Sequence, residues 1–206
     1  MIRLRHLLYL GFGCLSACAQ PTTQNLYAAY LEPHSWSYHA HREGLGSVYD
    51  GRITMQSKPI DNTHSKLEVH LLKDANDPKS GGVQIYWLDF SSFPPRITNS
   101  SSTGGNATLE PGFALPNESL KAGNGQARYA KTQGVLSLKN LAFSWKYFSL
   151  APDRLNNRVR FDLEFRSAYK LTNSNIRCEL SARGIERAEW KTSYGTTTSF
   201  ELENFR

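Results

Sequence analysis

The strongest pattern in this sequence is an alternation of apolar and charged side chains between Arg158 and Arg166. Apolar residues occupy the odd positions from Val159 to Phe165, and every even position carries a charge. Successive side chains of a β-strand point to opposite faces, so this pattern predicts a strand with one buried face and one face in water. Such strands are typical of antiparallel sheets.

Shorter alternating runs occur along most of the chain. They predict further strands at residues 47–55, 66–73, 83–90, 135–138, 141–148, 176–181 and 196–203. Helix is expected only near residues 26–31. Many short strands separated by turn residues predict an all-β fold, either an antiparallel β-sandwich or a partly open barrel.

Residues 91–126 lack this alternation. The segment contains Pro94-Pro95, Gly104-Gly105 and a run of three serines before them. It is much longer than the ~4–6 residues of an ordinary connection. We expect one long loop inserted into a single β-rich domain that spans residues 26–206; a linker between two small lobes is the alternative.

The N-terminal segment has the pattern of an export signal. Arg3 and Arg5 precede a short apolar run, residues 7–17, which ends in small residues. A basic start, a short apolar stretch and small residues before a cleavage site are typical of a secretory signal peptide. A run of this length spans only part of a ~30 Å bilayer core, so a permanent transmembrane helix is not expected.

The end of that run, Leu15-Ser16-Ala17-Cys18, resembles the lipobox of bacterial lipoproteins. The resemblance implies removal of residues 1–17, a diacylglyceryl group on Cys18 and acylation of the new amino group. Several acyl chains form a stable membrane anchor without a spanning helix. Ala19 stands where an aspartate would favour inner-membrane retention, so the resemblance implies the outer membrane, with the domain facing the periplasm. Residues 18–25 would form the tether.

Cysteine content argues against disulfides in the mature chain. Removal of residues 1–17 takes away Cys14, and Cys18 would carry the lipid. Cys178 therefore has no partner, and the fold depends on its apolar core. Cys178 alternates with Ile176 and Leu180, which predicts a buried, unreactive thiol.

His39 and His41 are the most suggestive candidates for a metal site. Two residues apart on a strand, they share one face, where two imidazoles can bind one metal ion. A third ligand would come from a set comprising His34, His64, His70, Glu43 and Asp50. A single His-x-His arises easily by chance, however, so exposed or hydrogen-bonded histidines are the better interpretation, and no cofactor is expected.

Positive charge is concentrated in the C-terminal part of the chain. The formal net charge is +6, and most of the excess of Lys and Arg lies in residues 127–206. The outward face of the 158–166 strand carries Arg158, Arg160 and Arg166. This face is either an ordinary solvated surface or a contact site for anionic headgroups or an acidic partner. The export signal argues against nucleic acid as a partner.

The sequence contains no strong catalytic signature. A Gly-x-Ser-x-Gly motif is missing, and the glycine pairs lack the strand and helix that phosphate-binding loops require. An aromatic set could line a ligand groove or fill the core; it comprises Trp36, Tyr38, Tyr49, Tyr86 and Trp87.

We therefore expect a non-catalytic protein of the bacterial envelope, anchored to the membrane by its lipid. Its role would be that of an assembly factor, a ligand-binding protein or a periplasmic immunity protein, with a protein partner in the envelope. The alternative is an envelope hydrolase that uses a metal bound by His39 and His41.

Overall fold

The computed structural model describes residues 26–72, 82–92, 94–102, 105–115, 122–134, 142–149, 158–167 and 173–206. These residues form a short 3-10 helix and twelve β-strands. In chain order the elements are η1 (Ala28–Leu31), β1 (Ser35–Gly44), β2 (Ser47–Pro59), β3 (His64–Leu72), β4 (Gly82–Asp89), β5 (Arg96–Ser102), β6 (Gly105–Ala114), β7 (Ala122–Gly134), β8 (Ala142–Ser149), β9 (Val159–Ser167), β10 (Ser174–Ser181), β11 (Gly184–Thr192) and β12 (Thr197–Phe205).

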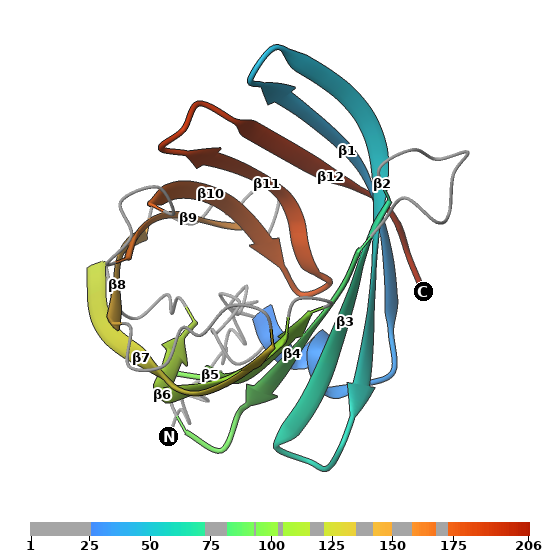
Figure 1. The fold of residues 1–206 in the computed structure, drawn as a ribbon. Coiled ribbons are helices and arrows are strands. Elements are labelled where there is room, and N and C mark those ends of the chain that lie inside the picture. Colours follow the sequence, from blue (N-terminus) through green and yellow to red (C-terminus); the bar gives the residue numbers. More distant parts are fainter. Residues whose placement is uncertain are drawn as a thin grey trace, which may run out of the picture.

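The strands form one closed barrel (Figure 1). Each strand pairs antiparallel with the next in sequence, and β12 returns to pair with β1. Closure satisfies the backbone hydrogen bonds of every strand on both sides and leaves no exposed edge. The all-β prediction is confirmed. The sandwich was wrong, and the barrel is closed rather than partly open.

The 158–166 strand is confirmed as β9. Val159 and Phe161 are fully buried inside the barrel, whereas Arg160 is exposed on the outside. The predicted strands at 47–55, 66–73, 83–90, 141–148, 176–181 and 196–203 correspond to β2, β3, β4, β8, β10 and β12. The predicted segment 135–138 lies outside the described residues.

The long loop expected at residues 91–126 was wrong, because β5, β6 and the first residues of β7 lie in it. These strands contribute a few apolar side chains to the clusters, such as Ile97 and Phe113, but many of their residues are polar and bond across the ladder. Asn99 donates from Nδ2 to Thr108 Oγ1 at 3.2 Å, and the Ser101 hydroxyl donates to Asn106 Oδ1. The composition of β5 and β6 by itself favours turns. Hydrogen bonds to a neighbouring strand on each side nevertheless keep both segments extended.

A bulge accommodates the proline and glycine of β6. Ile97 pairs with Phe113, but Asn99 already pairs with Thr108, so extra residues of β6 lie opposite a short stretch of β5. The extra stretch contains Pro111, which has no N–H to donate, and Gly112, whose φ is +96°. Residues that normally end a strand are thus tolerated at this irregularity.

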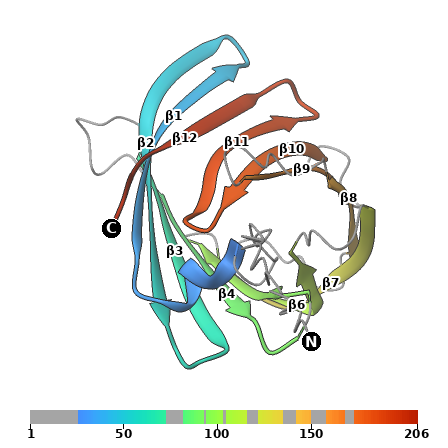
Figure 2. The same cartoon turned by 180° about the vertical axis from the view of Figure 1, so that it is seen from behind.

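Because each strand is antiparallel to the next, the connections between strands lie alternately at the two ends of the barrel. We call the end where β1 begins and β12 stops the η1 end, because η1 packs there on β2, β3 and β11. Figure 2 shows η1 beside β3. The opposite end, which we call the far end, carries the β1–β2 and β11–β12 turns. Their backbones meet: a Cβ on Gly44 would lie 2.4 Å from the Gly195 carbonyl oxygen.

Two apolar clusters fill parts of the interior. The larger joins residues before and within η1, such as Leu26 and Tyr30, to Trp36, Tyr38 and Phe161 on the strands. The smaller comprises Ala127, Phe143 and Trp145, on β7 and β8. The Trp145 indole lies directly over Gly125, its partner across the ladder.

The predicted signal peptide (residues 1–17), the lipid site Cys18 and the tether (residues 18–25) lie outside the described residues. Within the described ranges, no helix has both the length and the apolar character needed to cross a bilayer.

Candidate ligand-binding cavity

The barrel encloses a cavity of about 510 Å³. Its wall is built mainly from aliphatic and aromatic side chains of β2, β3, β4, β9, β10 and β11. Ligand sites in proteins typically occupy ~300–1,000 Å³ and are largely apolar, with a few polar groups that orient the ligand. Barrels of eight strands already leave room for one small ligand. Size and lining therefore both match a site for a small apolar molecule.

Strand alternation explains the apolar wall. On β3, Leu67, Val69 and Leu71 line the cavity, while Lys66 and Glu68 between them belong to the outer face. The Lys66 ammonium lies 5.4 Å from the Trp87 ring, and Lys58 pairs with Glu68 at 2.6 Å. Charged residues on the outside thus interact with each other and with water, which leaves the inside apolar.

Three aromatic side chains close the η1 end of the barrel against the turn before β11. Trp36 donates from Nε1 to the Arg183 carbonyl, and the Tyr38 hydroxyl donates to the Ile185 carbonyl at 3.0 Å. The Ile185 N–H donates to the Tyr30 hydroxyl oxygen at 3.2 Å. Burial raises the pKa of Tyr30 and Tyr38 well above the usual range, so both stay neutral.

A buried carboxylate stabilises the same turn. Glu186 is only 5% exposed and accepts hydrogen bonds from Arg183 Nε at 3.0 Å and Nη2 at 2.9 Å. The Ser181 hydroxyl also donates to it, and Arg158 Nη2 lies 3.9 Å away. A buried charge with this many partners fixes the β10–β11 turn beneath the aromatic group.

The wall of β4 contributes a polar pair. The Tyr86 hydroxyl donates to Gln84 Oε1 at 2.6 Å, and both residues line the cavity. Burial raises the pKa of Tyr86, which keeps the hydroxyl protonated as a donor. Since the carbonyl side of Gln84 is engaged, its Nε2 amino group is the part left to donate elsewhere.

Toward the far end the lining changes character. Arg42, Trp190 and Thr198 line the cavity there, and Thr198 pairs with both others across the ladder. Trp190 is 47% exposed although it lines the cavity, so the cavity reaches the molecular surface beside it. A ligand can therefore approach from this end.

Cys178 lies where the alternation predicted, with its side chain in the barrel wall lining the cavity. Burial, followed by the nearby charge of Glu179, raises the pKa of the thiol to about 12. A thiol in this environment stays protonated and is a poor nucleophile. Its role in the structure is that of a small apolar wall residue.

His39 and His41 are brought together, but on the outer face of β1. Asp50 on β2 contacts both, with Oδ1 at 2.7 Å from His41 Nδ1 and at 3.8 Å from His39 Nε2. No set of three His, Cys, Asp or Glu side chains in the described ranges could hold a metal ion. Two other candidate ligands, His34 and His64, instead pair with Glu32 and Asp61 at the η1 end.

The predicted basic face is matched by carboxylates. Arg160 makes two hydrogen bonds to Glu179, at 3.0 and 2.6 Å, and Arg158 lies 3.7 Å from the same residue. Arg166 pairs with Glu164 at 2.9 Å. With a partner for each of the three arginines, the face presents mixed charge rather than a positive patch.

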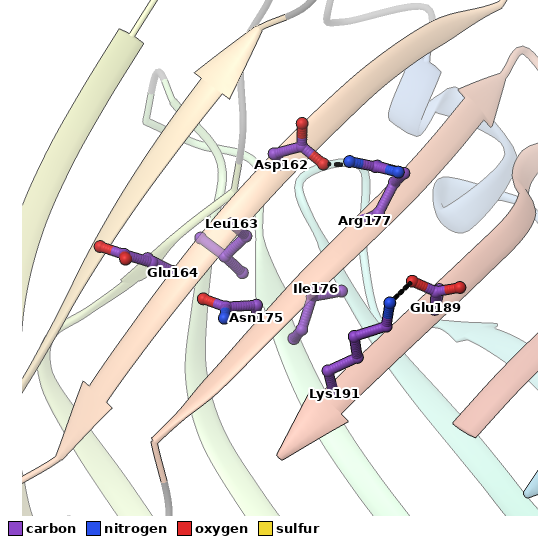
Figure 3. Close-up of a pocket in the computed structure, with 8 residues that line it drawn as sticks. All are labelled: Asp162, Leu163, Glu164, Asn175, Ile176, Arg177, Glu189 and Lys191. Carbon is purple, nitrogen blue, oxygen red and sulfur yellow. Dashed lines mark hydrogen bonds and ion pairs between the residues drawn. The ribbon is translucent and has the colours of Figure 1, made fainter. Parts of the chain in front are cut away.

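A shallow groove of about 280 Å³ runs along the same outer wall (Figure 3). Figure 3 shows Arg177 directed toward Asp162 and Lys191 toward Glu189; the pairs lie at 2.8 and 3.0 Å. Asp162 also raises the pKa of Arg177. The charged groups that line this groove are all in ion pairs, Glu164 with Arg166 and the others with one another, so the cavity inside the barrel is the stronger candidate for a binding site.

The aromatic set suggested by the sequence is divided between core, cavity and outer face. Trp36 and Tyr38 are buried in the larger cluster, Tyr86 lines the cavity, and Trp87 stacks with Lys66. The side chain of Tyr49 lies outside the described part. The sequence analysis missed Arg42 and Gln84. The only feature of the sequence that could have revealed them is that each occupies an inward-facing position in the alternation of its strand.

No protein-family model matches this chain, and no curated protein matches it significantly.

Proposed function

We propose that this protein is a binding protein that holds an apolar ligand inside its barrel, and that a lipid on Cys18 anchors it in the bacterial outer membrane. The cavity of about 510 Å³ supports the first part, because its wall is apolar and it reaches the surface beside Trp190. Of the roles expected from the sequence, ligand binding is the one that this observation favours.

The location of η1 gives the anchor a geometric consequence. The chain enters the described fold at Leu26, which is buried in the cluster at the η1 end. Eight residue steps separate Cys18 from Leu26, a reach of at most ~28 Å when fully extended. A lipid on Cys18 would therefore keep Leu26, and with it the η1 end, within about 28 Å of the bilayer surface.

The cavity is tested by filling it. Ala40 lines the cavity, whereas its neighbour His39 points outward on the same strand. We expect a neutral apolar dye, N-phenyl-1-naphthylamine, to bind the chain saturably with an increase in fluorescence. Ala40→Phe should weaken dye binding at least tenfold, because the added ring occupies the cavity. His39→Phe adds the same ring on the outer face and should leave binding unchanged.

Two results would contradict the binding proposal. One is dye binding that is equally strong in the Ala40→Phe and wild-type proteins, with both folded by circular dichroism. The other is the lack of any saturable binding by the wild-type chain.

The anchor is tested separately. Cells labelled with an alkyne fatty acid should incorporate the label into the wild-type protein but not into Cys18→Ser. Equal labelling of the two would exclude Cys18 as the lipid site while leaving the cavity proposal intact. A protein partner in the envelope remains a prediction, which cross-linking in intact cells would address.

A further inference from the structure

We infer that the ligand is a single-chain amphiphile with an anionic head group, bound with its tail toward η1 and its head beside Arg42. This inference rests on the proposed function, since it names the chemical class of the molecule that occupies the cavity. Its basis is the distribution of polar groups along the cavity.

The η1 end of the cavity is lined mainly by apolar side chains. Met55, Leu67 and Leu88 line it there. The hydroxyl of Tyr30, which also lines this region, already accepts a hydrogen bond from Ile185 N–H at 3.2 Å. An alkyl chain placed here loses no hydrogen bonds with water, whereas a charged group would lose its hydration without finding a counter-charge.

At the far end the lining carries one permanent charge. Arg42 is the sole Arg or Lys among the described lining residues, and no Asp or Glu accompanies it. His41 also borders the cavity, but it alternates with Ala40 and Arg42 on β1, and its Nδ1 lies 2.7 Å from Asp50 Oδ1 on the outer face. Among the lining residues themselves, positive charge is therefore in excess, which favours an anionic head group.

The direction of Arg42 follows from strand alternation. It continues the inward series of Tyr38 and Ala40 on β1 and pairs with Thr198 across the ladder. Arg42 already has an interaction within the chain. A guanidinium group has five N–H donors, however, so it can keep that contact and still bind a carboxylate or phosphate.

Gln84 supplies a second donor at this end of the strands. Its Oε1 accepts from the Tyr86 hydroxyl at 2.6 Å, which orients the Nε2 amino group as a donor. Arg42 lies two residues before the β1–β2 turn, and Gln84 lies two residues after the start of β4 at the far end. The polar groups available to a ligand thus gather at the end of the cavity opposite η1.

The experiment compares four ligands that share a twelve-carbon tail and differ in their head group. Dodecanoate and monododecyl phosphate are anionic, 1-dodecanol is neutral and dodecyltrimethylammonium is cationic. The full chain carries Cys18→Ser, so that it can be handled without detergent, and calorimetry gives the dissociation constants. We expect both anions to bind at least tenfold more tightly than the alcohol, and the cation to bind most weakly.

Variants then locate the head group. Arg42→Gln should abolish the preference for anions while the affinity for 1-dodecanol stays within twofold, and Arg42→Lys should retain part of the preference. Arg52→Gln is the matched control, because Arg52 lies on the outer face of β2 and pairs with Glu203 at 3.4 Å. It should behave as wild type.

Tail length and fluorescence report on the cavity itself. Shortening dodecanoate to decanoate should weaken binding about three- to fourfold for each methylene removed. Bound ligand should shift the emission of Trp190, and Trp190→Phe should lose that shift. The relative affinity of dodecanoate and monododecyl phosphate distinguishes a carboxylate ligand from a phosphate ligand.

The outcomes separate this inference from the proposed function. If all four ligands bind equally and depend on tail length, the apolar site stands and the anionic head group is excluded. If the anion preference survives Arg42→Gln, Arg42 does not bind the head group. If none of the ligands binds, the proposed function itself fails. Should Arg42→Gln not fold, the wild-type head-group series and Arg42→Lys still decide the inference.

Discussion

The two ends of the barrel are built differently. At the η1 end, Trp36 is 1% exposed, and hydrogen bonds to the turn before β11 hold the aromatic side chains in place. At the far end, Trp190 is 47% and Leu45 73% exposed. The buried aromatic group thus lies at one end, and most of the exposed large apolar side chains of the described residues lie at the other; Ile60, in the β2–β3 turn, is the exception. The most deeply buried aromatic group and the open part of the cavity thus lie at opposite ends of the same strands.

The largest difference in stability should appear when a tryptophan is replaced by alanine at each end of the barrel. Trp36→Ala removes a fully buried ring and its hydrogen bond to the Arg183 carbonyl. It should lower the free energy of unfolding by about 3–5 kcal/mol. Trp190→Ala removes a ring that is half in contact with water, and should cost less than about 1 kcal/mol. Urea denaturation followed by circular dichroism measures both.

One outcome of this pair would contradict the contrast between the ends. If Trp190→Ala destabilises as strongly as Trp36→Ala, the far end is as tightly packed as the η1 end. The difference drawn between the two ends would then be wrong.

A second pair compares two glycines of the wall. A Cβ on Gly125 would lie 2.3 Å from Trp145 Cζ2, and this indole is buried in the smaller cluster. Gly125→Ala should therefore cost about 1–3 kcal/mol through overpacking. Gly82 begins β4 at the far end, and a Cβ added there would meet no atom of the described residues within 4 Å. Gly82→Ala should leave the free energy of unfolding within about 0.5 kcal/mol or raise it.

Thermal unfolding of both glycine variants gives the comparison directly. A Gly125→Ala protein as stable as wild type would mean that the Trp145 ring can move away from β7. The smaller cluster would then be loosely packed.

The sequence predicted the strands whose two faces differ most. In β9 the inner side chains contact the core and the outer ones contact water, so apolar and charged residues alternate along its sequence. β5 and β6 could not be predicted in this way. Asn99 and Thr108 bond to each other across the ladder, and only the neighbouring strands reveal that partnership. Polar residues in such pairs have the composition of a loop.

The cavity was still harder to predict. Its wall combines single inward residues from strands far apart in sequence, such as Arg42 on β1 and Gln84 on β4. The inward orientation of each residue can be inferred from the sequence only when its strand, and which alternate positions of that strand face inward, are already known. The sequence also left a sandwich and a partly open barrel as alternatives, because alternation defines an inner face without indicating whether two sheets pack together or one sheet closes. The His39–His41 pair shows the reverse case: a conspicuous spacing that leads to the outer surface.

The weakest effect that we expect concerns the acid response of the β2–β3 turn at the η1 end. Asp61 accepts hydrogen bonds from the Thr63 N–H at 2.7 Å and from the His64 N–H at 2.8 Å. The Thr63 backbone bond and then the His64 side chain lower the pKa of this carboxyl from 3.8 to about 2. In the unfolded chain the carboxyl takes up its proton at a higher pH than in the folded protein. Its contribution to stability is therefore complete above pH 3.8 and is lost as the pH falls toward 2.

Asp61→Asn keeps an acceptor oxygen in the turn but removes the ionisation. The variant should lose less stability than wild type between pH 4 and pH 2, with the difference confined to that window. Denaturation midpoints measured across this range test the prediction, together with Thr63→Val, which removes the hydroxyl that donates to Asp61 Oδ1 at 3.0 Å. Since Asp61 is fully exposed, the change is small beside that of Trp36→Ala. Identical acid profiles for Asp61→Asn and wild type would show that the turn does not hold the carboxylate, and the η1 end would then owe its stability to its aromatic group and to the hydrogen bonds of Glu186.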